Sequence, residues 1–328
     1  MENIPSTPKK KKKSGLVIFL LVILIAIIAA AAEIYAQINV QKITPENIKH
    51  IFSFNERYVA CLHIEGIIEQ KNDTYDQIWL LQTIEGLQND KRNAGILLDV
   101  NSPGGSVFET DEVYLALENY KSVTNRPVWA YFESLAASGG YYMSCAADFI
   151  AANRNTWTGS IGVIAGQSID ASQFLEEHGI KITTITAGKN KNMGSLSSPL
   201  TDEQKEILQS LADEAYDQFT GIVAQSRKMN IDQVKTLADG RVYSAKQALD
   251  AGLIDLVTSF DDTWNKMQDS ISTAKNPALI HYRPKEEFSI TKYLQSSFKL
   301  IKPSSAEEKI LSAVSHPEMT YPAYYWEP

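Results

Sequence analysis

The stretch AGILLDVNSPGGSV, Ala94 to Val107, decides the fold class. Its first part, AGILLDVN, is a nearly continuous apolar run, which is typical of a strand that helices cover on both faces of a sheet. Pro103 and two glycines end the run, and a helical pattern, ETDEVYLALENYKS, follows closely from Glu109. A buried strand that leads into a helix is the repeating unit of α/β proteins, so we predict a fold of this class.

The same alternation extends in both directions from this stretch. Further predicted strands are YVACLHIEGII (58–68), RPVWAYF (126–132), DFIAAN (148–153) and KITTIT (181–186), and predicted helices lie between most of them. The longest helix is predicted to begin at Thr201, where Thr201 and Gln204 form a capping-box pattern, and to end near Lys228. We therefore expect a mostly parallel sheet with flanking helices, whose site lies at the carboxyl ends of the strands.

The N-terminal segment has the pattern of a membrane anchor. Five consecutive lysines, Lys9 to Lys13, precede an uncharged apolar run from Gly15 to Ala32. This run just reaches the length that spans the hydrocarbon of a bilayer, and the lysines predict that the N-terminus is cytoplasmic. A cleaved signal peptide is the alternative, because small residues follow the run, although the apolar part of a signal peptide is usually shorter.

These patterns divide the chain into four parts. We expect a cytoplasmic basic tail (1–14), a transmembrane helix (15–36), an extracytoplasmic folded domain (37–275) and a C-terminal tail of unknown role (276–328). The first 36 residues carry a net charge of +3, which leaves −11 for the remainder of a chain whose total is −8. Such an acidic domain argues against nucleic-acid binding, while the lysine cluster would be attracted to anionic lipid.

Cysteine and histidine give no sign of a metal site or a disulfide. Cys61 and Cys145 are far apart in apolar runs and match no metal-ligand spacing, so we interpret them as buried small hydrophobic residues rather than a disulfide. The five histidines are scattered and belong to no recognisable motif. We therefore expect no metal, no cofactor and no Ser-His-Asp triad.

Three glycine-containing loops follow predicted strands and carry groups suited to acyl transfer. In DVNSPGGSV, adjacent glycines allow backbone N–H groups to approach a developing oxyanion, although an ordinary turn would also explain them. In YFESLAASGGYYMS, Ser138 lies at a predicted helix start, where it is either a simple N-cap or a nucleophile. In TAGKNKNMGSLSSP, Lys189 and Lys191 are either solvated or include the base, since burial can lower the pKa of a lysine toward neutrality.

Five motifs in this order resemble the short form of the signal peptide peptidase A family, also called protease IV. They are VNSPGG, AASGGYYMS, TGSIGV, AGKNKN with SSP following, and ADGRVYSAKQALDAGLID. The resemblance covers nearly the whole chain up to about residue 275. It implies a fold related to Clp protease and crotonase, and a serine endopeptidase with Ser138 as nucleophile and Lys191 as general base, with Lys189 as the neighbouring alternative.

The resemblance also implies the remaining site residues and the setting. Oxyanion donors fall on the N–H groups of Gly105 and Gly139, and Ser160 falls on a serine that orients the lysine amine, with a turn cap as its alternative role. The family's short members form rings in which neighbouring subunits supply the serine and the lysine of one site. Implied substrates are remnant signal peptides, cleaved on the outer side of a bacterial cytoplasmic membrane that the single helix spans.

Three other functions stay open at this point. A related membrane peptidase would act on membrane-associated partner proteins instead of signal peptides. A membrane-tethered scaffold of the same fold would not catalyse, although it would be free to lose the serine, lysine and glycines that are all present here. A crotonase-like enzyme would act on acyl thioesters, but export across a membrane argues against cytoplasmic coenzyme A substrates.

Overall fold

The computed structural model describes residues 57–272, 274, 276–284 and 323–325. The predicted basic tail (1–14) and transmembrane helix (15–36) therefore lie outside the described residues. Within these ranges, no helix combines the length and the apolar character that a bilayer crossing requires.

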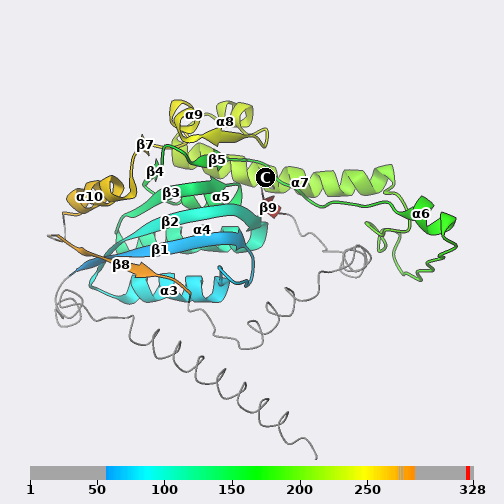
Figure 1. Cartoon of the computed structure of the whole chain (residues 1–328), viewed down its shortest axis with the longest axis horizontal. Coiled ribbons are helices and arrows are strands. Elements are labelled where there is room, and N and C mark those ends of the chain that lie inside the picture. The colour runs from blue at the N-terminus through cyan, green and yellow to red at the C-terminus, as the bar shows by residue number, and fades with distance from the viewer. Residues whose placement is uncertain (1–56, 273, 275, 285–322, 326–328) are drawn as a thin grey trace, which may run out of the picture. The chain divides into compact units, whose positions relative to one another are not determined.

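One mixed sheet forms the centre of the fold (Figure 1). Its strands are β1 (Tyr58–Ile68), β2 (Asn93–Ser106), β3 (Val128–Ala137), β4 (Phe149–Ala152), β5 (Trp157–Gly159), β6 (Val242–Ser244), β7 (Leu256–Val257), β8 (Ala278–Tyr282) and β9 (Ala323–Tyr325). The main order is β6-β5-β3-β2-β1-β8, with β4 and β9 paired to β3 and β2, and β7 paired to β4. Most pairs are parallel, as predicted, and only the β5–β6 and β2–β9 pairs among these strands are antiparallel.

Helices cover both faces of the sheet and create two hydrophobic cores. The helices are α3 (Gln77–Asn89), α4 (Val107–Thr124), α5 (Gly139–Ser144), α6 (Ser172–Glu177), α7 (Asp202–Arg227), α8 (Ile231–Leu237), α9 (Ala245–Asp250) and α10 (Phe260–Ser270). The larger core joins one sheet face to α3, α4, α5 and the C-terminal part of α7, and the smaller joins the other face to α10. Coverage of both faces explains the continuous apolar strands of the sequence.

Helix α7 confirms its predicted boundaries. Thr201 caps it by accepting a hydrogen bond from the Gln204 backbone N–H, and the Gln204 side chain accepts one from the Thr201 backbone N–H. The helix ends at Arg227, and its C-cap residue Lys228 has a φ of 54°, in the left-handed region. Its apolar residues belong only partly to the core, because Phe219 and Val223 are buried whereas Leu211, nearer the N-terminus, is exposed.

An arm, defined as residues 164–200, leads from the sheet to the N-terminus of α7 (Figure 1). It contains α6, and its outgoing and returning segments are joined where the Ala171 N–H donates to the Leu196 carbonyl over 2.9 Å. The predicted strand 181–186 is wrong, because this segment is irregular and no described strand pairs with it. Its β-branched residues favour a strand, but without a neighbouring strand to complete its hydrogen bonds Ile185 is left 95% exposed.

The tail predicted at 276–328 contributes two strands. β8 pairs in parallel with β1, and β9 pairs antiparallel with the end of β2, where Gly105 lies opposite Tyr324. Residues far apart in the sequence therefore complete the sheet.

Candidate active site

Ser138 lies at the sharp turn between β3 and α5. Its φ of 53° and ψ of −116° are unusual for a residue with a side chain, and the residue is only 1% exposed. A backbone conformation of this kind costs about 1–3 kcal/mol and persists only where the surrounding structure enforces it. Although Ser138 occupies the N-cap position, its side chain makes no capping hydrogen bond to α5. Helix capping therefore does not explain why a serine is present here.

Strand β5 brings Ser160 next to this turn. Ala137 lies opposite Gly159 in the parallel β3–β5 pair, and the Ser138 N–H donates to the Gly159 carbonyl over 2.8 Å. Ser160, with a φ of 48°, donates its N–H to the Arg241 carbonyl over 2.8 Å. The two serines thus follow paired positions at the carboxyl ends of two neighbouring strands.

The two glycine loops meet beside Ser138, as the strand order predicts. A Cβ atom added to Gly139 would lie 3.2 Å from both Gly104 Cα and Gly105 N, and 2.6 Å from Thr110 Oγ1. A Cβ atom on Gly105 would lie 1.9 Å from the Ile68 carbonyl oxygen, so only glycine fits at this position. The backbones of the two adjacent turns are therefore packed against each other at the ends of β2 and β3.

Side chains hold α5, and with it the turn, in a fixed position. The Tyr142 hydroxyl donates to Asp111 Oδ1 over 2.5 Å and accepts from Gln218 Nε2 over 2.7 Å, which links α5 to α4 and α7. The Tyr141 hydroxyl donates to the Leu253 carbonyl over 2.8 Å, and complete burial raises the pKa of Tyr141 well above its ordinary value. Rigid support of this kind is what precise catalytic geometry requires.

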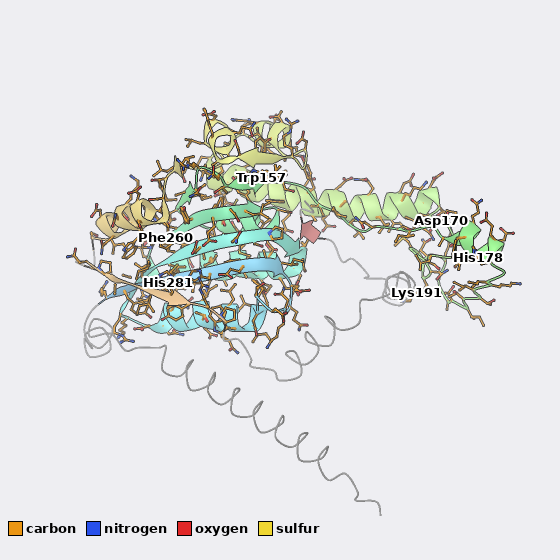
Figure 2. All side chains as sticks on the ribbon, viewed as in Figure 1. Trp157, Asp170, His178, Lys191, Phe260 and His281 are labelled. Carbon is orange, nitrogen blue, oxygen red and sulfur yellow. The ribbon has the colours of Figure 1, made fainter. Side chains whose placement is uncertain are left out.

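The lysines lie elsewhere in the chain. Figure 2 shows Lys191 on the arm, which also carries Asp170 and His178, beyond the end of the sheet. Lys191 is exposed, and its backbone N–H donates to the Gly188 carbonyl over 3.2 Å. Lys189 forms an ion pair with Glu203 in the first turn of α7, and this contact lowers the pKa of the Glu203 carboxyl. A single chain thus assembles Ser138, Gly139, Gly105 and Ser160, and leaves Lys191 apart from them.

Thr110 lies beside the site, although no motif of the sequence points to it. It lies in the first turns of α4, is fully buried, and its Oγ1 atom has no hydrogen-bond partner among the described residues. Because this atom faces Gly139, it limits the space beside the two glycine loops.

Strand β9 shows that the end of β2 accepts an extended segment. Three consecutive residues, 323–325, pair antiparallel with Gly104, Gly105 and Ser106. A cavity of about 560 Å³ adjoins this edge between α4 and α7, and Val107, Phe108, Leu211 and Ala215 provide its apolar lining. Addition of an extended peptide to a sheet edge beside a side-chain pocket is a common way of binding peptides.

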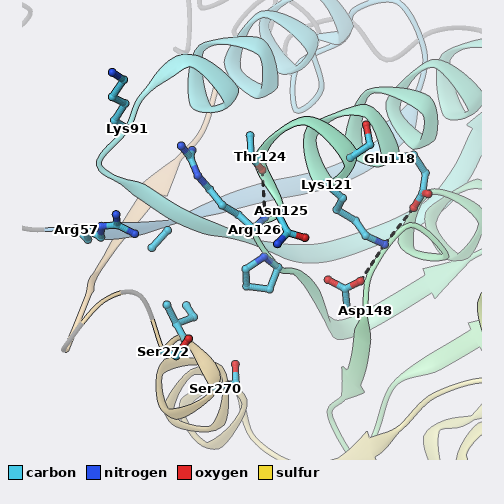
Figure 3. A pocket seen from close by; sticks show the side chains of 14 residues that line it. Arg57, Lys91, Glu118, Lys121, Thr124, Asn125, Arg126, Asp148, Ser270 and Ser272 are labelled. Atoms are coloured by element: carbon cyan, nitrogen blue, oxygen red, sulfur yellow. Dashed lines mark hydrogen bonds and ion pairs between the residues drawn. The ribbon is translucent and has the colours of Figure 1, made fainter.

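A larger cavity lies at the opposite edge of the sheet. Its volume is about 990 Å³, and Figure 3 shows charged side chains around it, including Arg57, Lys91 and Arg126. Lys121 on this wall already contacts Asp148 at 2.9 Å and Glu118 at 3.2 Å. The cavity lies at the amino ends of β2 and β3 and contains no residue of the predicted site, so its size does not make it the catalytic cleft.

Comparison with known proteins agrees with the predicted family. Residues 121–273 match peptidase family S49. The chain is 34% identical over 262 residues to the "Putative protease" of Methanocaldococcus jannaschii, which covers 78% of this chain and 81% of that relative. It is 33% identical to the "Putative signal peptide peptidase SppA" of Enterococcus faecium, over 69% of this chain and 67% of the relative. A ClpP1 mutant of Listeria monocytogenes aligns with a TM-score of 0.42 at 16% identity, over 62% of this chain and 92% of the other.

The chain belongs to peptidase family S49 and is a serine peptidase. The family resemblance that the five sequence motifs indicated is therefore confirmed.

Proposed function

We propose that this protein is a membrane-anchored serine endopeptidase that uses Ser138 and Lys191 to degrade remnant signal peptides. The observation that carries the proposal is the division of the site: Ser138 and both glycine loops meet within one chain, while Lys191 lies on the arm. A second copy of the chain, bound so that its arm reaches the first, would supply the missing base. The functional unit is then a homo-oligomer with sites shared between neighbouring subunits.

Each residue has a distinct chemical task in the proposed reaction. The neutral amine of Lys191 removes the hydroxyl proton of Ser138, and Oγ attacks the carbonyl carbon of the scissile peptide bond. The N–H groups of Gly105 and Gly139 stabilise the oxyanion of the tetrahedral intermediate. The Lys191 ammonium then protonates the leaving amine, and Ser138 carries the acyl group.

Hydrolysis of the acyl-enzyme uses the same groups, with water as the nucleophile and Ser138 as the leaving group. Lys191 takes a proton from a water molecule, the resulting hydroxide attacks the ester carbonyl, and Ser138 leaves with its proton restored. Ser160, which lies beside Ser138, is proposed to accept or donate the hydrogen bond that orients the Lys191 amine. This sequence of steps needs no metal and no nucleotide.

The substrate class follows from the edge of β2 and from the predicted anchor. An extended segment already pairs with residues 104–106, and the adjoining cavity presents Phe108 and Leu211. Apolar, leucine- and alanine-rich peptides suit such a surface. The lysine cluster and apolar run of residues 9–32 would fix the peptidase domain on the outer side of the membrane, where signal-peptide remnants are produced.

Mixing two inactive variants tests the shared site. Detergent-solubilised Ser138→Ala and Lys191→Ala proteins are combined at equal concentration, allowed to exchange subunits, and assayed with a fluorogenic leucine-rich peptide. If neighbouring chains supply the serine and the lysine, about one quarter of the sites regain both groups, so activity recovers to about a quarter of the parent value. A mixture that stays inactive after demonstrated subunit exchange contradicts the shared site, and an active Ser138→Ala protein contradicts the nucleophile.

A further inference from the structure

A cluster of metal-ligating side chains lies on the sheet face that α10 covers, on the opposite side from α5. Cys61 and His63 of β1 are two residues apart and therefore point to the same face, and Cys61 lies directly opposite His281 in the parallel β1–β8 pair. His63 Nε2 is 2.8 Å from His281 Nδ1 and 3.9 Å from Cys61 Sγ. All three ligand atoms lie within 4.8 Å of one another.

These distances suit a small tetrahedral cation. Zinc binds histidine nitrogen at about 2.0–2.1 Å and thiolate sulfur at about 2.3 Å, which places tetrahedral ligand atoms roughly 3.3–3.7 Å apart. The two histidine nitrogens would therefore separate by about half an ångström, and the sulfur would approach by a smaller amount. Two imidazoles and one thiolate are also the ligand types that zinc prefers over magnesium or calcium.

An independent observation comes from Asp99 of β2, the residue paired with His63. Asp99 Oδ2 lies 3.2 Å from His63 Nδ1, and the carboxylate side chain is only 6% exposed. Its other oxygen, Oδ1, is buried without a hydrogen-bond partner among the described residues. A carboxylate that accepts the Nδ1 proton of a histidine leaves the Nε2 lone pair free, and this is the usual outer partner of a zinc-bound histidine.

The surrounding charges are mixed, with acidic groups in excess. Glu65 Oε1 lies 3.8 Å from His63 Nδ1, and Asp99 lies on the same side of the ring. Arg283 places Nη2 3.2 Å from His63 Nδ1 and Nη1 3.4 Å from Glu65. Because a guanidinium only donates, the zinc-bound form of His63, with its proton on Nδ1 and shared with Asp99, requires Nη2 to move away from Nδ1. Buried Asp99 and half-exposed Glu65 outweigh the single arginine, which makes the cluster favourable for a divalent cation.

We propose that Cys61 Sγ, His63 Nε2 and His281 Nδ1 bind a zinc ion, with Asp99 orienting His63. Cys61 and His63 are buried and His281 is exposed, so a water molecule would complete the tetrahedron from the side of His281. The ion would join edge strand β8 to β1 through side chains as well as through backbone pairing. This proposal is independent of the peptidase mechanism, and it replaces the expectation of no metal site drawn from scattered histidines.

Metal titration of the full-length protein tests the site. The Ser138→Ala background prevents self-digestion, and zinc binding is measured by competition with a chromophoric chelator. We expect one tight zinc equivalent per chain, a loss of affinity of at least about 100-fold in Cys61→Ala and in His281→Ala, and a loss of about 10- to 100-fold in Asp99→Asn. His178→Ala is the matched control, because His178 is an exposed histidine on the arm.

Cobalt substitution and thermal unfolding provide readouts that do not depend on affinity alone. Bound cobalt should show a thiolate charge-transfer band that disappears in Cys61→Ala, and saturating zinc should raise the melting temperature of the background protein but not of His281→Ala. His281 is exposed, so its variant remains informative even if Cys61→Ala fails to fold. The proposal is overturned if the background protein binds no stoichiometric zinc, or if His281→Ala binds zinc as tightly as His178→Ala.

Discussion

The contact between Gly139 and Thr110 allows stability and catalysis to be separated. In Gly139→Ala the new methyl group would lie 2.6 Å from Thr110 Oγ1, closer than real Cβ contacts, so one of the two elements must move. Overpacking of this kind costs about 1–3 kcal/mol in the free energy of unfolding. Thr110→Ala removes the obstructing oxygen, and because that oxygen has no hydrogen-bond partner in the described structure, the cost is mainly a buried methyl group of about 1 kcal/mol.

The double variant should therefore recover stability without recovering activity. We expect Gly139→Ala with Thr110→Ala to be about 1–2 kcal/mol more stable than the sum of the single changes. The methyl group would still lie 3.2 Å from Gly105 N, one of the two proposed oxyanion donors, on the residue that supplies the other. Displacement of one such donor costs about 100- to 1,000-fold in kcat.

Urea unfolding gives the stabilities, and hydrolysis of a fluorogenic leucine-rich peptide gives kcat. Gly86→Ala is the control, since a Cβ on this residue of α3 meets nothing within 4 Å, and its effect should be a gain of about 0.5–1 kcal/mol with unchanged kcat. A Gly139→Ala protein as stable as the parent would contradict the overpacking against Thr110, and a double variant with full activity would contradict the role of the two N–H groups.

Three further predictions concern the arm, acid stability and the tail. Lys189→Ala should keep at least about half of the parent activity, because Lys189 is paired with exposed Glu203 in a solvent-screened surface contact, and loss of all activity would identify it as the base instead. The Arg241 guanidinium lowers the pKa of Asp239 to about 2, so this pair supports folding above the ordinary aspartate pKa and loses that contribution as pH falls toward 2; Asp239→Asn should flatten the pH dependence of the melting temperature in that range. Deletion of residues 323–328 should free the edge of β2 and raise kcat/KM for extended peptides several-fold, whereas an unchanged value would show that β9 does not compete with substrate.

Local sequence was sufficient for the elements whose stability is set by burial and capping. The continuous apolar runs of β1, β2 and β3 and the capping box at Thr201 each predicted an element that the structure contains. Segment 181–186 failed because its β-branched residues express a local preference, while a strand requires a neighbour, and no described strand lies beside it.

Prediction of the candidate site was limited in the same way, because local sequence does not show which distant strands become neighbours. Strand order along the sequence was enough to place Gly105, Gly139 and Ser138 together, because consecutive parallel strands end at one edge of the sheet. It could not bring His63 and His281 together, since they are 218 residues apart and meet only through the pairing of β8 with β1.

Helix α7 has a consequence for assembly that its sequence alone does not suggest. With 26 residues it is about 39 Å long at 1.5 Å per residue, and the loop that carries Lys191 precedes its N-terminus. Each residue inserted into the exposed half would shift that loop by about 1.5 Å and rotate it by about 100°. Under the shared-site proposal, the number of residues in α7 sets how far Lys191 lies from the sheet of its own chain and in which direction it projects. It thereby sets the spacing between neighbouring subunits at which a complete site can form.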